Sequence, residues 1–244
     1  MIICSLNDAV IDLLAEKEDF LDGTAHSGML KAAFRLINDS AEVLMDAFQR
    51  YPDYRLVITG HSLGAGVSAL IHMGVRGGAF QEVLPSDIPL KTVLLAPPPI
   101  YKAPAEIPEE LTNEIMSFVF GNDAIPRASI SNMRDFFEDA YELGKVDFTQ
   151  SQILKLLNGE KDEEVEACLE AMKEATSKAR RTSMGHRLNH VGNTYYLSRH
   201  DKKVFKVNGS FFSNRFLLLK RSILDHKAPN YEKAFENVDN FTSV

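Results

Sequence analysis

A serine set between two glycines offers the clearest chemistry in this sequence. Gly60-His61-Ser62-Leu63-Gly64 fits the pattern Gly-x-Ser-x-Gly, in which a sharp turn between a strand and a helix exposes a serine hydroxyl as a nucleophile. The two glycines would leave out Cβ atoms that clash in such a turn. At the start of the following helix, the backbone N–H of Leu63 can face a negative charge that develops on a substrate oxygen. The pattern therefore predicts acyl-transfer chemistry with Ser62 as the nucleophile.

The segments around Ser62 are the ones that such a turn requires. Tyr54–Thr59 is a short run rich in β-branched and apolar residues, which is typical of a buried strand. A helix is expected from Leu63 to Arg76, where Gly77 and Gly78 end it. The five-residue pattern alone arises by chance in many proteins. The strand before it and the helix after it therefore carry the prediction.

A serine nucleophile needs a base, and the base needs a carboxylate that orients it. Asp123 follows an expected strand at Ile115–Phe120, so it should lie at the carboxyl edge of the sheet, where Ser62 also emerges. Asp87 precedes a strand and would lie at the opposite edge. Asp123 is therefore the candidate acid. A turn aspartate without a catalytic part would have the same local sequence.

The base is harder to assign, because four of the seven histidines follow the candidate acid: His186, His190, His200 and His226. We expect His190 within a strand at Asn189–Leu197 and His200 in a hairpin turn. His226 lies in an expected loop, Ser222–Pro229, just before the last helix. Such a loop can reach back to the serine more easily than a strand interior can. The residues alone favour His226 and leave the others open.

The remaining histidines and the cysteines indicate no metal site. His61 should point away from the neighbouring serine, and His72 should be a packed or surface residue of its helix. Cys4 and Cys168 are the two cysteines, and no Cys/His pair has zinc-ligand spacing. The sequence has no dinucleotide-binding fingerprint either. We expect chemistry without a metal or other cofactor.

Composition excludes several broad classes. The 244 residues carry 27 basic and 34 acidic side chains, a formal net charge of −7, which disfavours nucleic-acid binding. Neither a signal peptide nor a run of eighteen apolar residues is present. From these features and the low cysteine content we expect a cytoplasmic chain without a transmembrane segment.

The order of elements indicates an α/β fold with a mostly parallel sheet flanked by helices. Apolar residues recur at helical spacing from Met29 to Phe48, and further strands are expected near Thr92–Ala96 and Val204–Val207. A stretch near 133–185 interrupts this alternation, with a helical stripe among many glutamates. We expect one domain, 1–244, with a helical insert near 133–185. That insert is either a solvated amphipathic helix or, alternatively, a lid or regulatory insert.

Four segments resemble the class 3 lipases, and most closely their sn-1-specific diacylglycerol lipases: Ala25–Leu30, Ile58–Gly66, Gly121–Arg127, and Leu224–His226 with Tyr231 beyond. The resemblance implies an α/β-hydrolase fold. It implies Ser62 as nucleophile, Asp123 as orienting acid and His226 as general base. It further implies a glycerolipid substrate, met at a membrane or droplet surface by a peripheral protein. In related lipases that have a membrane anchor, the anchor lies upstream.

The sequence departs from this family near its first residue. An Arg-Gly-Thr or Arg-Gly-Ser segment of the family, whose hydroxyl residue helps to bind the oxyanion, corresponds to Met1, Ile2 and Ile3. Ile3 could offer a backbone N–H but no hydroxyl. We therefore expect a chain that lacks the first strands of the domain. Two alternatives to the lipase function stay open: a non-catalytic remnant that binds lipid or a partner, and a phospholipase A1 or carboxylesterase.

Overall fold

The computed structural model describes residues 17–179, 187–212, 220–237 and 240–242. The chain divides into two compact units. The first comprises residues 1–130 and 187–244, and the second comprises residues 131–186. All of the candidate catalytic residues belong to the first unit.

The first unit is built on a six-stranded sheet with the order β3-β4-β6-β7-β8-β9. Its strands are β3 (Leu56–His61), β4 (Leu90–Leu95), β6 (Ile115–Phe120), β7 (Asn193–Leu197), β8 (Lys203–Val207) and β9 (Asn240–Thr242). The strands β3, β4, β6 and β7 run parallel, β8 is antiparallel to β7, and β9 is parallel to β8. The prediction of a mostly parallel sheet is confirmed.

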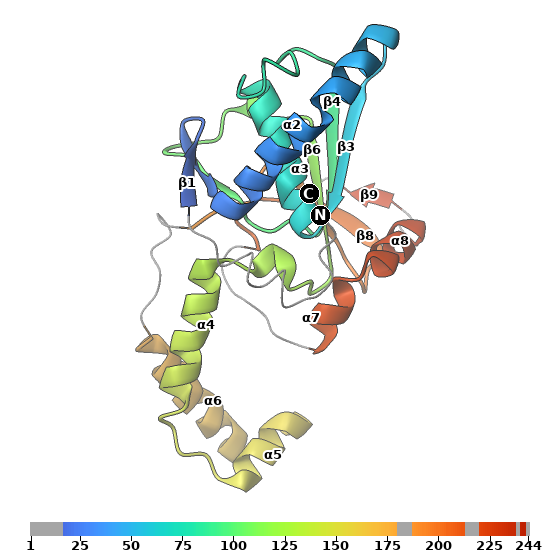
Figure 1. The fold of residues 1–244 in the computed structure, drawn as a ribbon. Coiled ribbons are helices and arrows are strands. Elements are labelled where there is room, and N and C mark those ends of the chain that lie inside the picture. Colours follow the sequence, from blue (N-terminus) through green and yellow to red (C-terminus); the bar gives the residue numbers. More distant parts are fainter. Residues whose placement is uncertain (1–16, 180–186, 213–219, 238–239, 243–244) are drawn as a thin grey trace. The chain divides into compact units, whose positions relative to one another are not determined.

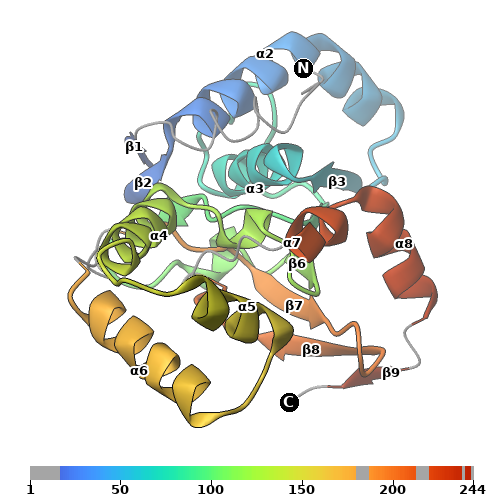
Figure 2. The same cartoon turned by 90° about the horizontal axis from the view of Figure 1, so that it is seen from below.

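Helices cover both faces of this sheet, as Figures 1 and 2 show. They are α2 (Ser27–Arg50), α3 (Leu63–Arg76), α7 (Lys220–Asp225) and α8 (Ala228–Glu236). The helix α3 packs on β3 and β4, α2 packs on α3, and α8 packs on β6. Alternate strand residues therefore enter two apolar clusters. Leu94 and Ile115 pack on the side of α2 and α3, whereas Phe118 and Phe120 pack with Tyr231 of α8.

A small antiparallel sheet, which the sequence did not indicate, combines two strands that precede the helix α2 with one that follows β4. It consists of β1 (Lys17–Phe20), β2 (Gly23–His26) and the two-residue β5 (Tyr101–Lys102). The strand β2 leads directly into α2, where the His26 ring accepts a hydrogen bond from the backbone N–H of Met29. Two 3-10 turns, Glu109–Leu111 and Ile125–Arg127, lie before and after β6.

Three expected boundaries need correction. The first long strand begins at Leu56 rather than Tyr54. The expectation that His190 lies in a strand is wrong, because β7 begins only at Asn193. Gly192 has a φ of +75°, a left-handed conformation that interrupts the extended chain there. The expected loop Ser222–Pro229 is largely helical, since α7 and α8 leave only His226 and Lys227 between them.

The second unit contains three helices: α4 (Ile130–Leu143, whose first residue belongs to the first unit), α5 (Gln150–Asn158) and α6 (Glu163–Ser177). The helix α5 begins with a reciprocal capping box between Thr149 and Gln152. Lys155 of α5 forms ion pairs with Asp162 and Glu164, which join the two helices. Of the helices that the structure describes, none has the length and apolar character needed to cross a membrane.

Candidate active site

Ser62 occupies a strained turn between β3 and α3. Its φ of 59° and ψ of −129° are rare for a residue with a side chain, and its backbone N–H donates to the carbonyl of Leu95 (2.9 Å). A Cβ at Gly60 would lie 2.4 Å from the carbonyl oxygen of Gly64, so a glycine is required there. A Cβ at Gly64 would meet no atom within 4 Å, so the expected steric need for that glycine is wrong.

The first turn of α3 supplies a candidate oxyanion donor. Leu63 is the first residue of this 14-residue helix, and the first N–H groups of a helix have no partner within it. The N–H groups of Ala65 and Gly66 donate to the carbonyl of Ser62, which completes the turn. Within the part of the chain that the structure describes, the N–H of Leu63 donates no backbone hydrogen bond, which makes it the candidate donor to a substrate oxygen. Ile3, the second expected donor, lies outside the described residues.

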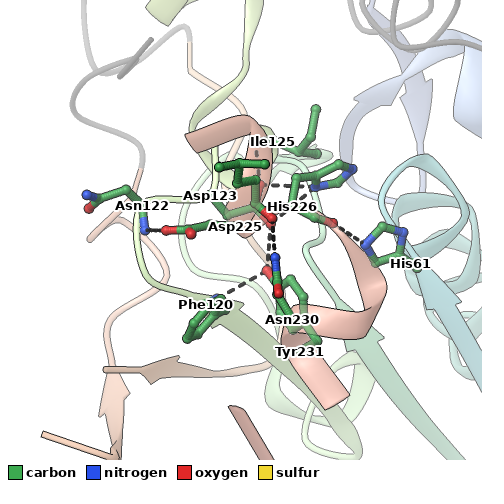
Figure 3. Close-up of polar contacts among 10 residues, drawn as sticks. His61, Phe120, Asn122, Asp123, Ile125, Asp225, His226, Asn230 and Tyr231 are labelled. Carbon is green, nitrogen blue, oxygen red and sulfur yellow. Dashed lines mark hydrogen bonds and ion pairs between the residues drawn. The ribbon is translucent and has the colours of Figure 1, made fainter. Parts of the chain in front are cut away.

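Asp123 and His226 form a pair beyond the carboxyl end of β6 (Figure 3). Nδ1 of His226 lies 3.1 Å from each carboxylate oxygen of Asp123. The carboxylate is fully buried, and the imidazole side chain is 15% exposed. This arrangement fixes the ring so that Nδ1 carries the proton and Nε2 can accept one. The structure thus brings together two residues that lie 103 positions apart.

Two further donors hold the carboxylate of Asp123 in place. Oδ2 accepts a hydrogen bond from the hydroxyl of Tyr231 (2.6 Å), and Oδ1 accepts one from the backbone N–H of Ile125 (2.9 Å). The Tyr231 oxygen also accepts the N–H of Phe120 (3.1 Å). Burial, followed by the charge of Asp123, raises the pKa of Tyr231 well above its ordinary value, so its hydroxyl stays protonated and donates.

His61 connects the nucleophile turn to the base. Its Nε2 lies 2.9 Å from the backbone carbonyl of His226, and the two rings lie 4.7 Å apart between centroids. Burial, followed by the positive charge that His226 would carry, lowers the pKa of His61. A neutral His61 with its proton on Nε2 can donate to that carbonyl. The residue next to Ser62 therefore anchors the backbone of the candidate base.

The Ser62 hydroxyl and the His226 ring are not joined by a hydrogen bond in the part of the chain that the structure describes. Such bonds often tighten only when substrate is bound. The hydroxyl is half-buried at the mouth of the turn, in the same unit as the pair.

The other histidines have different surroundings. Nδ1 of His72 lies 2.9 Å from the Thr92 hydroxyl, and Nε2 of His190 lies 2.7 Å from the carbonyl of Pro126. Burial is the main reason that the pKa of each is lowered to about 4. His200 lies in the turn between β7 and β8, as expected, and His186 lies outside the described residues.

Sequence reasoning missed the partners of this pair rather than its members. The sequence indicated Tyr231 through its place in a family-like segment, and it predicted that His61 points away from Ser62. The hydrogen bonds from Tyr231 to Asp123 and between His61 and His226 leave no local sequence signal, because each joins residues more than a hundred positions apart. Among the described residues, no group of three or more His, Cys, Asp or Glu side chains could hold a metal ion.

Known proteins resemble this chain in sequence and in fold. Diacylglycerol lipase-beta of Mus musculus is 36% identical over 143 residues, which cover 54% of this chain and 19% of that protein. The chain thus spans about a fifth of the length of this relative. The triacylglyceride lipase of Rhizomucor miehei has a similar structure, with a TM-score of 0.53 and 16% identity over 91% of this chain and 66% of that one. This similarity confirms the α/β-hydrolase fold.

The family comparison covers more than half of the chain. The model of the family described as lipase (class 3) matches residues 4–133, a range that includes both Ser62 and Asp123. The chain belongs to the class 3 lipase family.

Proposed function

We propose that this protein is a serine hydrolase that cleaves fatty-acyl esters of glycerolipids. The observation that carries the proposal is the buried Asp123–His226 pair. The backbone carbonyl of His226 also contacts the ring of His61, the residue before Ser62. A strained serine turn without a base would be a structural loop, and a buried Asp–His pair without a nucleophile would be an ion pair. Their combination in one unit supports a catalytic triad.

The chemistry would proceed in two halves. Nε2 of His226 takes the proton of the Ser62 hydroxyl as Oγ attacks the ester carbonyl carbon. The tetrahedral intermediate places its negative oxygen near the backbone N–H of Leu63. Collapse of the intermediate transfers the proton from His226 to the leaving glyceride oxygen and leaves an acyl-enzyme. Water, deprotonated by the same nitrogen, then releases the fatty acid and restores Ser62.

The substrate proposal follows from family membership and from the name of the mouse relative. We propose diacylglycerol or triacylglycerol, met at the surface of a membrane or lipid droplet by a peripheral, cytoplasmic protein. A phospholipase A1 or a short-chain carboxylesterase would use the same three residues, because pocket walls set substrate choice. Fatty-acid release from vesicles of each lipid class, compared with release from a soluble short-chain ester, separates these activities.

A fluorophosphonate probe tests the nucleophile directly. We expect the purified chain to be labelled at Ser62, as located by peptide mass spectrometry, and to lose both labelling and ester hydrolysis in Ser62→Ala. The matched control is Ser68→Ala, which changes a serine of the helix that follows Ser62; the Ser68 hydroxyl donates to the carbonyl of Thr59, and this variant should be labelled normally. A folded wild-type chain that neither labels nor hydrolyses any of these esters would leave the non-catalytic remnant as the better explanation.

A further inference from the structure

A second buried carboxylate lies beside the candidate base. Asp225 ends α7 and directly precedes His226, and its side chain is 1% exposed. Oδ2 accepts a hydrogen bond from the backbone N–H of Asn122 (2.9 Å), the residue before Asp123. Figure 3 shows this contact next to the Asp123–His226 pair. One carboxylate thus contacts the chain one residue before the acid and is itself one residue before the base.

Arg199 balances the charge of this second carboxylate. It comes from the turn between β7 and β8, and its guanidinium forms an ion pair with Asp225. The guanidinium also lies over the ring of Phe120 (4.9 Å to the centroid), the last residue of β6. Arg199 is 30% exposed, so solvent reaches it from one side. The pair therefore joins three segments: the end of β6, the turn after β7, and the end of α7.

The turn after β6 is shaped to admit the carboxylate. Gly121 has a φ of +53°, and a Cβ on it would lie 2.5 Å from Oδ2 of Asp225. Both its conformation and the space around it favour glycine. The backbone N–H of Ala124 also approaches the carbonyl of Ser222 in α7 (3.4 Å). The acid loop and the α7 end are therefore connected through a side chain and through the backbone.

We propose that Asp225, paired with Arg199, is a positioning residue that sets the separation of Asp123 and His226. The inference rests on the proposed hydrolase function. It goes beyond the triad because Asp225 faces the backbone of Asn122 and the guanidinium of Arg199, not the imidazole. The Asp225 carboxylate binds the backbone next to Asp123, and Asp225 is bonded in the chain to His226. It can therefore keep the acid and the base at a fixed separation. A small misplacement of such groups is enough to slow a reaction about a hundredfold.

Three variants separate positioning from general stability. Asp225→Asn keeps an acceptor for the Asn122 N–H and removes the charge opposite Arg199. Arg199→Met keeps the side-chain stem over Phe120 and removes the guanidinium, and Arg199→Lys restores a positive charge. We expect kcat to fall at least tenfold in the first two variants with KM little changed, and to recover in part in Arg199→Lys.

A second readout does not depend on turnover. In protein labelled with ¹⁵N-histidine, the Nδ1 proton of His226 that is shared with Asp123 should give a downfield resonance. We expect this resonance to shift or to broaden by exchange with solvent in Asp225→Asn and Arg199→Met. Because the signal reports the pair itself, it tests positioning even if the wild-type chain proves to hydrolyse nothing. The proposed function is tested separately, by fluorophosphonate labelling of the wild-type chain and by its hydrolysis of esters.

The matched control breaks an Arg–carboxylate pair at the other edge of the sheet. Glu114 precedes β6 and pairs with Arg76 of α3. Glu114→Gln should change thermal stability without changing kcat or the His226 resonance. If Asp225→Asn and Arg199→Met behave as Glu114→Gln does, with altered stability but unaltered kcat and resonance, Asp225 is only a structural anchor and the proposal is wrong.

Discussion

Two regions of the same sheet each hold an imidazole against an oxygen, with different consequences. Beyond the carboxyl end of β6, Nδ1 of His226 lies 3.1 Å from the carboxylate oxygens of Asp123. Between α3 and β4, Nδ1 of His72 lies 2.9 Å from the hydroxyl of Thr92. The distances are alike, and both oxygens belong to fully buried side chains. The charge of the oxygen is the difference.

That charge decides what each ring can do. A neutral hydroxyl gives no compensation for an imidazolium, so burial, with the charge of Arg76 in support, lowers the pKa of His72 to about 4. The ring of His72 therefore stays neutral near pH 7 and serves packing. A buried carboxylate can stabilise the imidazolium that forms when a serine gives up its proton. Burial and a hydrogen bond are common to both sites, and only the site with a negative charge is equipped for proton transfer.

Removing that charge should give the largest effect. In Asp123→Asn the single amide oxygen can still accept the N–H of Ile125, while the amide NH2 replaces the oxygen that accepts the hydroxyl of Tyr231 and can donate to that hydroxyl oxygen instead. We expect the loop to keep its conformation. The substitution makes the His226 site resemble the His72 site, with a neutral partner at Nδ1. We expect kcat for ester hydrolysis to fall on the order of 10⁴-fold. Initial rates on a soluble ester, with circular dichroism as the check of folding, measure this.

The comparison would break if Asp123→Asn kept most of its activity while folded. In that case His226 would need no negative charge, and the difference between the two sites would lie elsewhere. Thr92→Asn is the matched control, because it also places an amide opposite a buried histidine. It should leave kcat near the wild-type value in whatever fraction of the protein folds.

Tyr231→Phe should give an intermediate effect. The change removes the 2.6 Å hydrogen bond to Asp123 and leaves the buried N–H of Phe120 without its acceptor. We expect a loss of about 1–3 kcal/mol in the free energy of unfolding. Because the carboxylate keeps its contacts with Ile125 and His226, kcat should fall by about tenfold, well short of the Asp123→Asn effect. Urea unfolding and steady-state kinetics on the same preparation give both numbers. If kcat fell as far in Tyr231→Phe as in Asp123→Asn, Tyr231 itself would take part in proton transfer.

The neutral histidine should be visible as acid sensitivity. His72 is expected to have a pKa near 6.5 when unfolded and has one lowered to about 4 when folded, so the unfolded chain binds more protons between these values. Its contribution is present above pH 6.5 and is lost as the pH falls toward 4, by at most about 1.4 kcal/mol per pH unit. His190 has the same direction of shift and should contribute in parallel.

His72→Gln measures the share that belongs to one ring. We expect the variant to lose less stability than the wild type between pH 6.5 and 5, by up to about 1.4 kcal/mol per unit, because glutamine does not titrate. Denaturant unfolding at both pH values gives the change in the free energy of unfolding with pH for each protein. Comparing this change between the variant and the wild type removes the loss that the substitution causes at neutral pH. If the dependence of stability on pH is the same in His72→Gln and in the wild type, His72 binds a proton as readily in the folded protein as in the unfolded chain.

The sequence predicted the parts of the site that depend on local pattern. The elbow requires a strand, a serine with a positive φ and a helix, and each leaves a mark within a few residues. The helix Leu63–Arg76 and the strand Ile115–Phe120 have the bounds that were expected. Asp123 and His226 came from loop position and from family resemblance, and the structure places them in hydrogen-bond contact. Their catalytic roles remain a proposal that the variants above test.

The contacts around the pair could not be predicted in the same way. Tyr231 contacts Asp123 across 108 positions, and Asp225 contacts Asn122 across 103 positions. The tyrosine was noted as part of a segment that resembles the family, with no contact assigned to it. The strand predicted through His190 begins only at Asn193, because Gly192 has a left-handed conformation and lies against Ile115, a contact between distant segments. Periodicity records which face of an element is buried. It does not record which polar atom on that face finds a partner.

Thr92→Val should give the smallest effect and is the sharpest check of the structural site. Valine nearly matches threonine in volume, so the main change is that Nδ1 of His72 loses its partner in a buried position. We expect about 1 kcal/mol of lost stability, since an unsatisfied buried ring nitrogen is costly. The pKa of His72 should stay low, because burial rather than the hydroxyl is its main cause. The acid sensitivity of unfolding should therefore persist in Thr92→Val, with kcat unchanged. A kcat that fell along with stability would connect the α3–β4 contact to the site, and the contrast between the two imidazoles would no longer hold.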